Sequence, residues 1–344
     1  MSSGIVQLIA VGAQDEHIIG DPEISFFTST FKRHSNFSQS LEKQTIQGAV
    51  KNNSMSSIRF ERNGDLLGYT YFTLDNNTQS VDIQDWGKVI DKVELLIGGQ
   101  VIDVQDHDFT EKIAIDTYAQ NVTKSSNGTH PGASARSYFY PLRFFFCEGP
   151  QSAIPLVALQ YHTVDLRIYW GPEASNYNVE AYANYYYLDN EERGMMTSRK
   201  HDILITQVQK NIPSGELVQE LTFNHPVKYI ACSNTNSEST LTSIDNKIKM
   251  SINGTDIGAY KFAKPHYVDI MSYYHTNFVT SPDFFLHCFC LNTSSLQPSG
   301  SLNFSRLDSV KIHSETKPLI DPIYGVNYNI LRVNNGMAGL MYAN

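Results

Sequence analysis

The chain has 344 residues, and a hydrophobic content of 41% against a charged content of 18% excludes a largely disordered protein. The net charge of −9 argues against nonspecific binding to a nucleic-acid backbone, because the only basic clusters, 32–34 and 199–201, are short. The 20 Tyr and 18 Phe residues favour pleated surfaces, so the composition predicts an all-β protein.

Residues 1–30 are predicted to form an N-terminal arm with a short helical stretch. Asp21-Pro22-Glu23 is typical of a helix start, with Asp as the N-cap and Pro in the first turn. The arm has no core of its own, so we expect it to dock on its own body or on a neighbour. Its apolar residues, which we expect to make that contact, are Ile5, Val6, Leu8 and Ile9.

The arm does not have the features of a targeting signal. No basic residue precedes its apolar run, and acidic residues follow it. No run in the chain approaches the ~20 apolar residues of a membrane span. The sequence therefore predicts a soluble, cytoplasmic protein.

From about Leu41 onward, strand-like segments follow one another. A hairpin with its turn at Gly98-Gly99 is predicted within residues 90–104. A short helix is predicted within 107–122, a loop at 123–137, and a helical turn at 189–200 just before a new series of strands. The other predicted strands are 57–63, 67–75, 138–146 and 178–189.

The second half of the chain repeats the first. The hairpin positions Val93, Leu95, Ile97 and Gly99 match Ile248, Met250, Ile252 and Gly254. Without a gap, residues 146–164 match 289–307, and one extra residue then aligns Leu166 with Val310 and Ile168 with Ile312. A repeat of this length indicates two copies of a whole domain, each a sandwich or a double-sheet jelly roll. The positions predicted to be shared core are Phe146, Cys147, Pro155, Leu159 and Tyr161 in the first copy and Phe289, Cys290, Pro298, Leu302 and Phe304 in the second.

The stretch FCEGPQSAIPLVALQYHTVDLRI, residues 146–168, contains a thiol at Cys147 and an imidazole at His162. A catalytic thiol needs a base and an orienting partner. The second copy keeps a cysteine at the matched position but has Ser305 where the first has His162. The stretch is therefore interpreted as a core strand pair, with His162 on an outward or inter-subunit face.

No other motif indicates catalysis or a cofactor. Asp106-His107-Asp108 and His201-Asp202 could ligate a metal, but neither has a third partner at a diagnostic spacing, so both are interpreted as exposed polar turns. Phosphate-loop, nucleophile-elbow and zinc-protease motifs are absent from the sequence. The four cysteines are too few for a disulfide scaffold and are predicted to be free thiols in a reducing compartment. Glycosylation is an open prediction at Asn76, Asn127, Asn253 and Asn292.

Five separated motifs carry a resemblance to a known family. They are IVQLIAVGAQDEHIIGDPEISFF, PLRFFFCEGPQSAIPLVALQYHTVDLRI, the junction LDNEERGMM–HDILITQVQ, QPSGSLNFSRLDS and YNILRVNNGMAGLMYAN. In this order they resemble the major capsid proteins of large nucleocytoplasmic DNA viruses, which include iridoviruses, chlorella-type algal viruses and giant-virus relatives.

The resemblance implies an all-β fold of two tandem eight-stranded antiparallel jelly rolls with short helices in loops. The first would span residues 31–195 and the second 196–344. It also implies a homotrimer of pseudo-hexameric outline that tiles an icosahedral shell over an internal membrane. The implied partners are further copies of the chain, minor capsid or cement proteins and, indirectly, inner-membrane proteins, without direct contact with nucleic acid. No cofactor and no enzymatic activity are expected, and assembly into virions is expected in the host cytoplasm.

Other classes of protein share such folds, so fold alone does not decide the function. A minor capsid paralogue would have the same two domains. A β-sandwich carbohydrate-binding module could use the tyrosines to stack sugars, although a lectin would be expected to have a secretory signal. A cupin-like metalloenzyme is disfavoured because the sequence contains no His-X-His pair.

Overall fold

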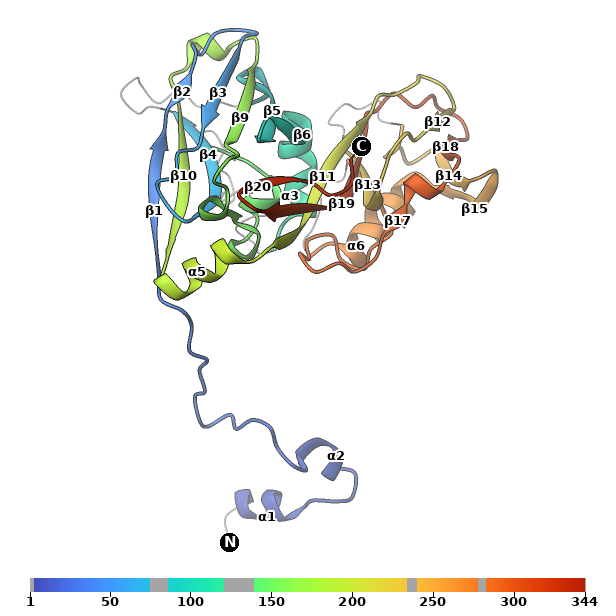
Figure 1. Cartoon of the computed structure of the whole chain (residues 1–344). Coiled ribbons are helices and arrows are strands. Elements are labelled where there is room, and N and C mark those ends of the chain that lie inside the picture. The colour runs from blue at the N-terminus through green and yellow to red at the C-terminus, as the bar shows by residue number, and fades with distance from the viewer. Residues whose placement is uncertain (1–2, 75–85, 121–138, 234–239, 278–282, 344) are drawn as a thin grey trace. The chain divides into compact units, whose positions relative to one another are not determined.

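The computed structural model describes residues 3–74, 86–120, 139–233, 240–277 and 283–343. The chain divides into two units, an arm of Met1–Asn36 and a body of Phe37–Asn344 (Figure 1). Among the described residues, no helix is both long and apolar enough to cross a membrane.

The arm contains two short helices, α1 (Ser3–Ile9) and α2 (Glu16–Ile19). It has no core: Leu8 is 78% exposed and Phe27 is 97% exposed. The helix predicted to start at Asp21 is wrong, because Asp21 has a φ of +47° and no helix follows it. A capping sequence does not sustain a helix there, since short helices depend on burying an apolar face.

The body begins with a sandwich of two antiparallel sheets. Its first sheet has the order β1-β10-β4-β7, with β8 also paired to β4. These strands are β1 (Phe37–Gln44), β4 (Leu66–Leu74), β7 (Phe139–Pro141), β8 (Ile154–Pro155) and β10 (Val179–Leu188). The second sheet has the order β2-β3-β9-β5-β6. Its strands are β2 (Ile46–Gln47), β3 (Met55–Arg59), β5 (Ile90–Ile97), β6 (Gln100–Asp106) and β9 (Val164–Trp170). The core of this sandwich includes Phe72, Trp86 and Trp170.

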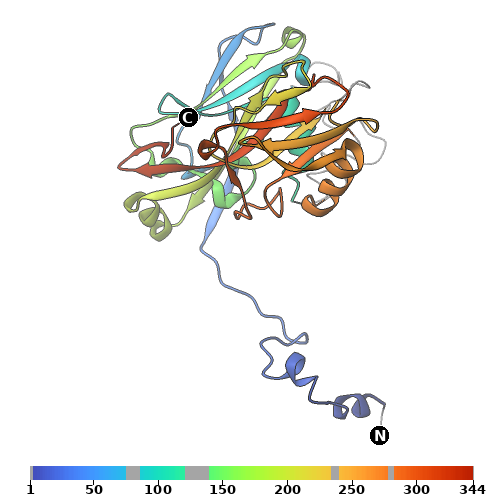
Figure 2. The ribbon, with the colours of Figure 1, turned by 90° about the vertical axis from the view of Figure 1, so that its right-hand side faces the viewer.

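A second sandwich follows with the same design. Its first sheet has the order β11-β19-β13-β16, with β17 paired to β13 and β20 paired to β19. These strands are β11 (His201–Asn211), β13 (Pro226–Ser233), β16 (Phe284–Cys288), β17 (Leu302–Asn303), β19 (Ile323–Asn334) and β20 (Met337–Leu340). Its second sheet has the order β12-β18-β14-β15. The strands are β12 (Val218–Glu220), β14 (Lys247–Ile252), β15 (Thr255–Phe262) and β18 (Val310–Ser314). Figure 2 brings this sandwich toward the viewer, with the β14–β15 hairpin in orange.

Short helices occupy the connections. Among the described residues of the body, the α-helices are α3 (Ala114–Thr117), α5 (Asn190–Ser198) and α6 (Met271–His275), and the π-helical segments are η2 (Phe109–Ile113) and η7 (Lys264–Ile270). The 3₁₀ turns are η1 (Trp86–Lys88), η3 (Phe145–Cys147), η4 (Pro150–Ser152), η5 (Leu156–Ala158), η6 (Ala174–Asn176) and η8 (Phe304–Arg306). The helical turn predicted at 189–200 is confirmed as α5, which Asp189 caps by accepting a hydrogen bond from the Glu192 N–H at 2.9 Å.

The strand orders confirm two eight-stranded jelly rolls in one chain. The order β1-β10-β4-β7 recurs as β11-β19-β13-β16, and β3-β9-β5-β6 recurs as β12-β18-β14-β15. The sheets of the first roll end at Leu188 and those of the second begin at His201. The domain limits predicted above, with a boundary at 195/196, stay predictions.

The repeated hairpin is confirmed. In β5–β6 the turn residues Gly98 and Gly99 have φ values of +59° and +82°, and in β14–β15 Asn253 and Gly254 have +48° and +78°. Two successive left-handed residues are what a two-residue hairpin turn that matches strand twist requires. The first residue of each turn also makes an equivalent hydrogen bond. The Gly98 N–H donates to the Thr163 carbonyl, and the Asn253 N–H donates to the Ser309 carbonyl.

The predicted strand 138–146 and the strand pair in 146–168 are partly wrong. Only β7 forms in the first segment, and 3₁₀ turns with the short β8 fill the second until β9 begins at Val164. The gap-free match to 289–307 is also wrong. Leu166 lies opposite Leu95 as Ile312 lies opposite Met250, so Leu166 matches Ile312. The connections before these strands differ in length between the two rolls, so no single offset fits.

Candidate functional site: the junction between the two sandwiches

A helical segment of the first sandwich covers the outer face of a sheet of the second. It consists of η2 and α3 and follows β6. The Phe109 ring centroid lies 5.9 Å from that of Tyr324 on β19. The whole buried cluster comprises Phe109, Ile113, Ala114 and Tyr118 with Tyr229, Ala231, Phe284, Leu286, Tyr324, Val326 and Cys290. An apolar contact therefore joins the two sandwiches.

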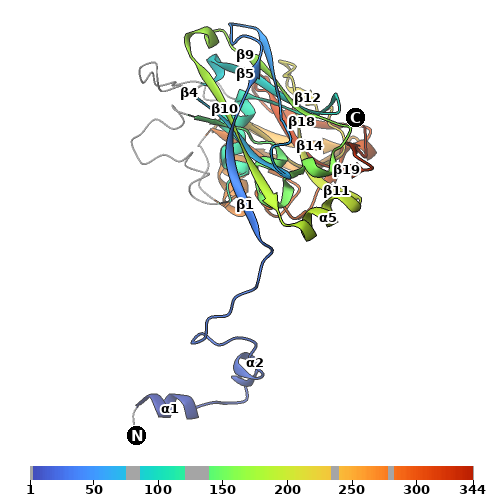
Figure 3. The ribbon, with the colours of Figure 1, turned by 60° about the vertical axis from the view of Figure 1, so that its left-hand side comes forward.

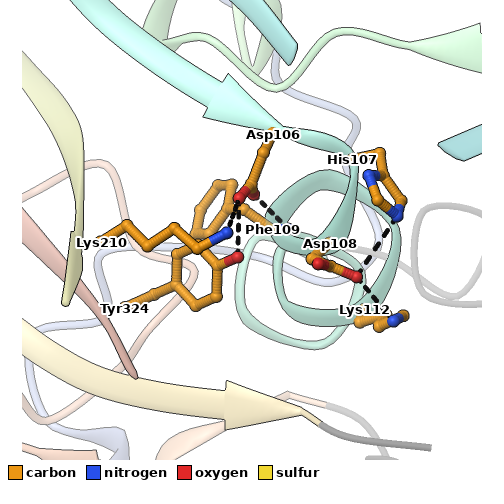
Figure 4. Close-up of polar contacts among 7 residues, drawn as sticks. All are labelled: Asp106, His107, Asp108, Phe109, Lys112, Lys210 and Tyr324. Carbon is orange, nitrogen blue, oxygen red and sulfur yellow. Dashed lines mark hydrogen bonds and ion pairs between the residues drawn. The ribbon is translucent and has the colours of Figure 1, made fainter. Parts of the chain in front are cut away.

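Asp106, the last residue of β6, is the centre of a polar contact at the same place (Figure 4). Its Oδ1 accepts a hydrogen bond from the Phe109 N–H at 3.0 Å. Its Oδ2 accepts from the Lys210 ammonium at 2.6 Å and from the Tyr324 hydroxyl at 2.8 Å. Burial and the Asp106 charge raise the pKa of Tyr324, which keeps that hydroxyl protonated as a donor. One carboxylate thus holds the start of the helical segment and two strands of the other sandwich.

The neighbouring acidic residue, Asp108, is also bound to cationic side chains of the chain itself. Its Oδ1 lies 2.6 Å from the Lys112 Nζ and 3.4 Å from the His107 Nε2. Burial is the largest single effect and opposes ionisation, but the hydrogen bond from Lys112 and the charges of His107, Lys112 and Lys210 together outweigh it, and the pKa of Asp108 is lowered. The interpretation of 106–108 as an exposed turn is wrong, because these side chains are 17–28% exposed and Asp106 lies in the junction. In the other candidate cluster, His201-Asp202, the Asp202 Oδ1 lies 2.9 Å from the Arg332 Nε.

A buried carboxyl group connects β6 to β11. Asp103 is 3% exposed; its Oδ1 accepts from the Val208 N–H at 2.8 Å and its Oδ2 from the Gln105 Nε2 at 2.8 Å. Burial raises the pKa of Asp103 to about 7, although both hydrogen bonds favour the ionised form. The Gln207 side chain donates to the Ile102 carbonyl beside it. The two strands are therefore joined by side chains that reach each other's backbone.

Strands β11, β19 and β20 of the second sandwich complete the core of the first. They contribute Ile205, Leu331, Val333 and Ala338 to its core cluster. His162 faces this segment, with its Nδ1 2.9 Å from the Ala338 carbonyl oxygen. The position of His162 is thus a contact between the two sandwiches of one chain, and the expected outward or inter-subunit face is wrong. It contacts backbone atoms and Gly98, not a second ligand.

The structure supports the expected inertness of the Cys147 thiol. All four cysteines are free. Burial raises the pKa of Cys147 to about 12, and burial also raises the pKa of Cys232. Cys288 and Cys290 hydrogen-bond each other, which raises the pKa of Cys288 and lowers the pKa of Cys290. Over the described ranges, no three His, Cys, Asp or Glu side chains are grouped so that they could hold a metal ion.

A cavity of about 310 Å³ lies between the sandwiches, lined by Tyr118, Phe145 and Glu148 from the first and by Ile205, Lys228 and Tyr328, among others, from the second. Lys228 is 3% exposed, and its ammonium donates to the carbonyls of Thr293 at 2.6 Å and Ser295 at 3.0 Å. Burial lowers the pKa of Lys228 to about 8. These two carbonyl oxygens accept hydrogen bonds from the buried ammonium group, which thereby connects β13 to the segment after β16. The sequence analysis did not identify Lys228, Asp103 or Lys210.

Most of the predicted shared-core residues are packed inside the body, but two are not. Phe146, Leu159, Cys290 and Phe304 are at most 4% exposed, Pro155 is buried, and Cys147, Phe289 and Leu302 pack against the cores. Tyr161 is 74% exposed, because it lies in the turn before β9, where its N–H donates to the Gly336 carbonyl. Pro298 is exposed in the loop before β17. Both are corrections to the predicted core.

The sequons fall in different settings. Asn76 and Asn127 lie outside the described residues. Asn253 is exposed in a hairpin turn, where its Oδ1 accepts from the N–H groups of Asp308 and Ser309. Asn292 donates to the Asn277 side chain at 2.9 Å. Glycosylation at these positions stays a prediction.

Replacing Asp106 with asparagine is expected to lower the free energy of unfolding by about 1.5–3 kcal/mol, the usual range for hydrogen bonds to a charged group. Asparagine retains an acceptor for the Phe109 N–H but loses the charge that faces Lys210. The matched control is Asp256→Asn, whose ion pair with Lys249 at 2.7 Å lies on an exposed hairpin and should change stability by about 0–1 kcal/mol. Denaturant midpoints measure both, and equal shifts would contradict a special role for Asp106.

Comparison with known proteins agrees with this architecture. Residues 25–183 match the family model for the major capsid protein N-terminus, and residues 192–339 match that for the large eukaryotic DNA virus major capsid protein. The major capsid protein of Pyramimonas orientalis virus is 31% identical over 100% of both chains, and that of Paramecium bursaria Chlorella virus 1 is 28% identical over 100% of both.

A solved structure is similar in fold. A chain of the PBCV-1 virus capsid superimposes with a TM-score of 0.77 at 26% identity, covering 93% of this chain and 100% of that one. The two family matches lie on the two sandwiches in chain order. The chain therefore belongs to the family of major capsid proteins of large eukaryotic DNA viruses.

Proposed function

We propose that this chain, a structural major capsid protein, assembles as a homotrimer of pseudo-hexameric outline. The observation that supports this is the repeat of one sandwich within the chain: three chains present six similar walls, which suits packing in a sixfold lattice. The capsomers would tile an icosahedral shell over an internal membrane in the virion, and the virion would be assembled in the host cytoplasm. The arm would be residues 1–30 and the two rolls 31–195 and 196–344.

The proposed role is structural and not catalytic. The capsid-protein relatives support this, and the acidic residues of the two candidate metal clusters bind lysines, an arginine and a tyrosine instead. The proposed partners are other copies of the chain and minor capsid or cement proteins, with inner-membrane proteins contacted indirectly. We propose no direct contact with nucleic acid, in line with the net charge of −9.

Size-exclusion chromatography with light scattering tests the trimer on the purified full chain. A stable species with three times the mass of one chain, 38.8 kDa, is the expected result. A monomer that binds glycans would contradict it and favour the carbohydrate-binding alternative.

Deleting residues 1–25 is expected to leave trimers intact but to block assembly of the lattice. The reason is that the arm exposes apolar side chains that need a partner, with Leu8 78% and Ile9 71% exposed. Electron microscopy of particles formed by the truncated and full chains measures this.

A matched pair of full-length variants separates arm contacts from arm length. Ile5, Val6, Leu8 and Ile9 are replaced together by serine in one variant, and the exposed polar residues Gln7 and Gln14 are replaced by serine in the other. Only the first variant should lose shells. Normal shells from it, or from the deletion, would contradict docking through the arm.

A further inference from the structure

The two sandwiches carry equivalent outer sheet faces, and among the described residues a helical segment covers only the face of the second sandwich. Strand pairing defines the equivalence. Tyr182 lies opposite Tyr71 on the first sandwich as Tyr324 lies opposite Ala231 on the second. Lys43 lies opposite Tyr182 as Lys210 lies opposite Tyr324. The lysine–tyrosine pair that receives Asp106 in the junction thus has a counterpart on the first sandwich.

The covered face belongs to the second sandwich. Its residues Tyr229, Phe284 and Tyr324 are 0–2% exposed because η2 and α3 of the same chain lie on them. The counterpart face is rich in tyrosine and partly exposed. Tyr69 is 44% exposed and Phe139 is 37% exposed; Tyr71 stacks on Tyr182 with ring centroids 5.7 Å apart and contacts Phe139 edge-on at 6.4 Å. Figure 3 brings the strands of this sheet, β1, β10 and β4, forward.

The helical segment that covers a face is repeated as well. A π-helical stretch and an α-helical turn follow β6 as η2 and α3, and they follow β15 as η7 and α6. Aligning the starts of the α-helical turns, Ala114 with Met271, matches Ile113 with Ile270 and Thr117 with Tyr274. Ile113 and Thr117 are 1% and 0% exposed in the junction, whereas Ile270 and Tyr274 are 43% and 72% exposed.

One polar feature is not repeated. Asp106 pairs with Lys92 across the first hairpin, and the residue that pairs with the equivalent Lys247 is Phe262, which is 47% exposed. On the first sandwich, Lys43 and Tyr182 already bind Glu180, which lies on their own sheet. The strand before the second helical segment therefore ends in an aromatic ring, where the strand before the first ends in a carboxylate. The sheet of the first sandwich supplies its own carboxylate, Glu180, to its lysine.

We propose that Phe262, Ile270 and Tyr274 of one chain pack on the tyrosine face of the next chain, formed by Tyr69, Tyr71, Phe139 and Tyr182. The contact repeats between chains the arrangement that η2 and α3 make within one chain. Each sandwich then carries its helical segment onto the sheet of the following sandwich, and the occupant of the tyrosine face is a second copy of this chain. The inference rests on the proposed trimer and names the surfaces that form it.

The first experiment measures the mass of the full chain and of two variants by light scattering. The unchanged chain must be a trimer; a monomer would reject the proposed function itself. In a trimeric background, Ile270→Asp with Tyr274→Asp is expected to shift the mass from three chains to one. The control is Ile212→Asp, at a residue that is 77% exposed and outside both surfaces, which should remain a trimer. A trimer that persists in the double variant would overturn the inference while leaving the proposed function standing.

A second measurement covers the case in which the aspartates disturb folding. Tyr274→Cys and Tyr69→Cys are combined in one chain, because their counterparts Thr117 and Tyr229 lie side by side in the junction. Mild oxidation is expected to form disulfides between chains and to give covalent dimers and trimers on denaturing gels. Each single substitution alone, and Ile212→Cys with Tyr69→Cys, should give monomers. Monomers from the combined variant in a trimeric sample would overturn the inference.

Discussion

Replacing Phe109 with alanine is expected to lower the free energy of unfolding of the body by about 3–5 kcal/mol, the range for truncating a fully buried Phe. The ring is 0% exposed and lies between Tyr118 of its own segment and Tyr324 of the other sandwich. Its loss leaves a cavity in the cluster that joins the two sandwiches. It also holds the backbone of residue 109 less firmly, and the N–H of that residue donates a hydrogen bond to Asp106.

Two probes make this prediction specific to the junction. Both tryptophans, Trp86 and Trp170, lie in the first sandwich, so their fluorescence follows that half, whereas circular dichroism follows all the sheets. We expect the two denaturation curves to coincide for the unchanged chain and to separate for the variant. Phe27→Ala, at a ring that is 97% exposed, should change stability by less than about 0.5 kcal/mol. Coincident curves and a loss below about 1 kcal/mol for Phe109→Ala would contradict coupling through this cluster.

Asparagine at position 103 is expected to remove a pH-dependent loss of stability. The native state raises the pKa of Asp103 to about 7 through burial, so it opposes ionisation. Such a group contributes full stability below its unfolded pKa, near 4, and the contribution is lost as the pH rises through about 7. Over about three pH units the loss is of the order of 4 kcal/mol, at about 1.4 kcal/mol per unit.

The measurement compares the free energies of unfolding of the unchanged chain and Asp103→Asn at pH 5 and pH 8. The difference, variant minus unchanged chain, should rise by about 2–3 kcal/mol between these values, because from pH 5 to about pH 7 Asp103 is ionised in the unfolded state but still protonated in the native state. Subtraction removes the contributions of the other carboxylates. Asp256→Asn, at an exposed residue, serves as the control and should give a difference that stays constant with pH. A constant difference for Asp103→Asn would contradict the raised pKa.

The repeat made much of the fold predictable. A period-2 pattern around Gly98-Gly99 and again around Asn253-Gly254 specifies two hairpins, because only those residues readily take two successive positive φ values. The segments between strands were harder. YFYPLRFFF, residues 138–146, has the composition of a strand, yet only Phe139–Pro141 forms one, because the chain then turns away through η3 and η4. The strand propensities of these residues do not indicate that change of direction.

The junction was not predictable in the same way. Asp103 lies between Ile102 and Val104 in a strand, and alternation indicates only that its side chain is on the opposite face from theirs. That this face is covered by β11 depends on how two domains pack, and a single sequence carries no local signal for such packing. Asp106 stood out as part of an acidic-histidine cluster, but its partners Lys210 and Tyr324 are more than a hundred residues away.

The closing of the first core by the last strands has a consequence for the order of folding. Leu331, Val333 and Ala338 belong to the core cluster of the first sandwich, yet they are translated long after β10 completes its sheets. N-terminal domains generally fold first during synthesis. Here the first sandwich stays incomplete until the end of the second has left the ribosome, so both halves reach their final form together. A chain that ends before β19 would therefore lack part of the core of the first sandwich as well as strands of the second.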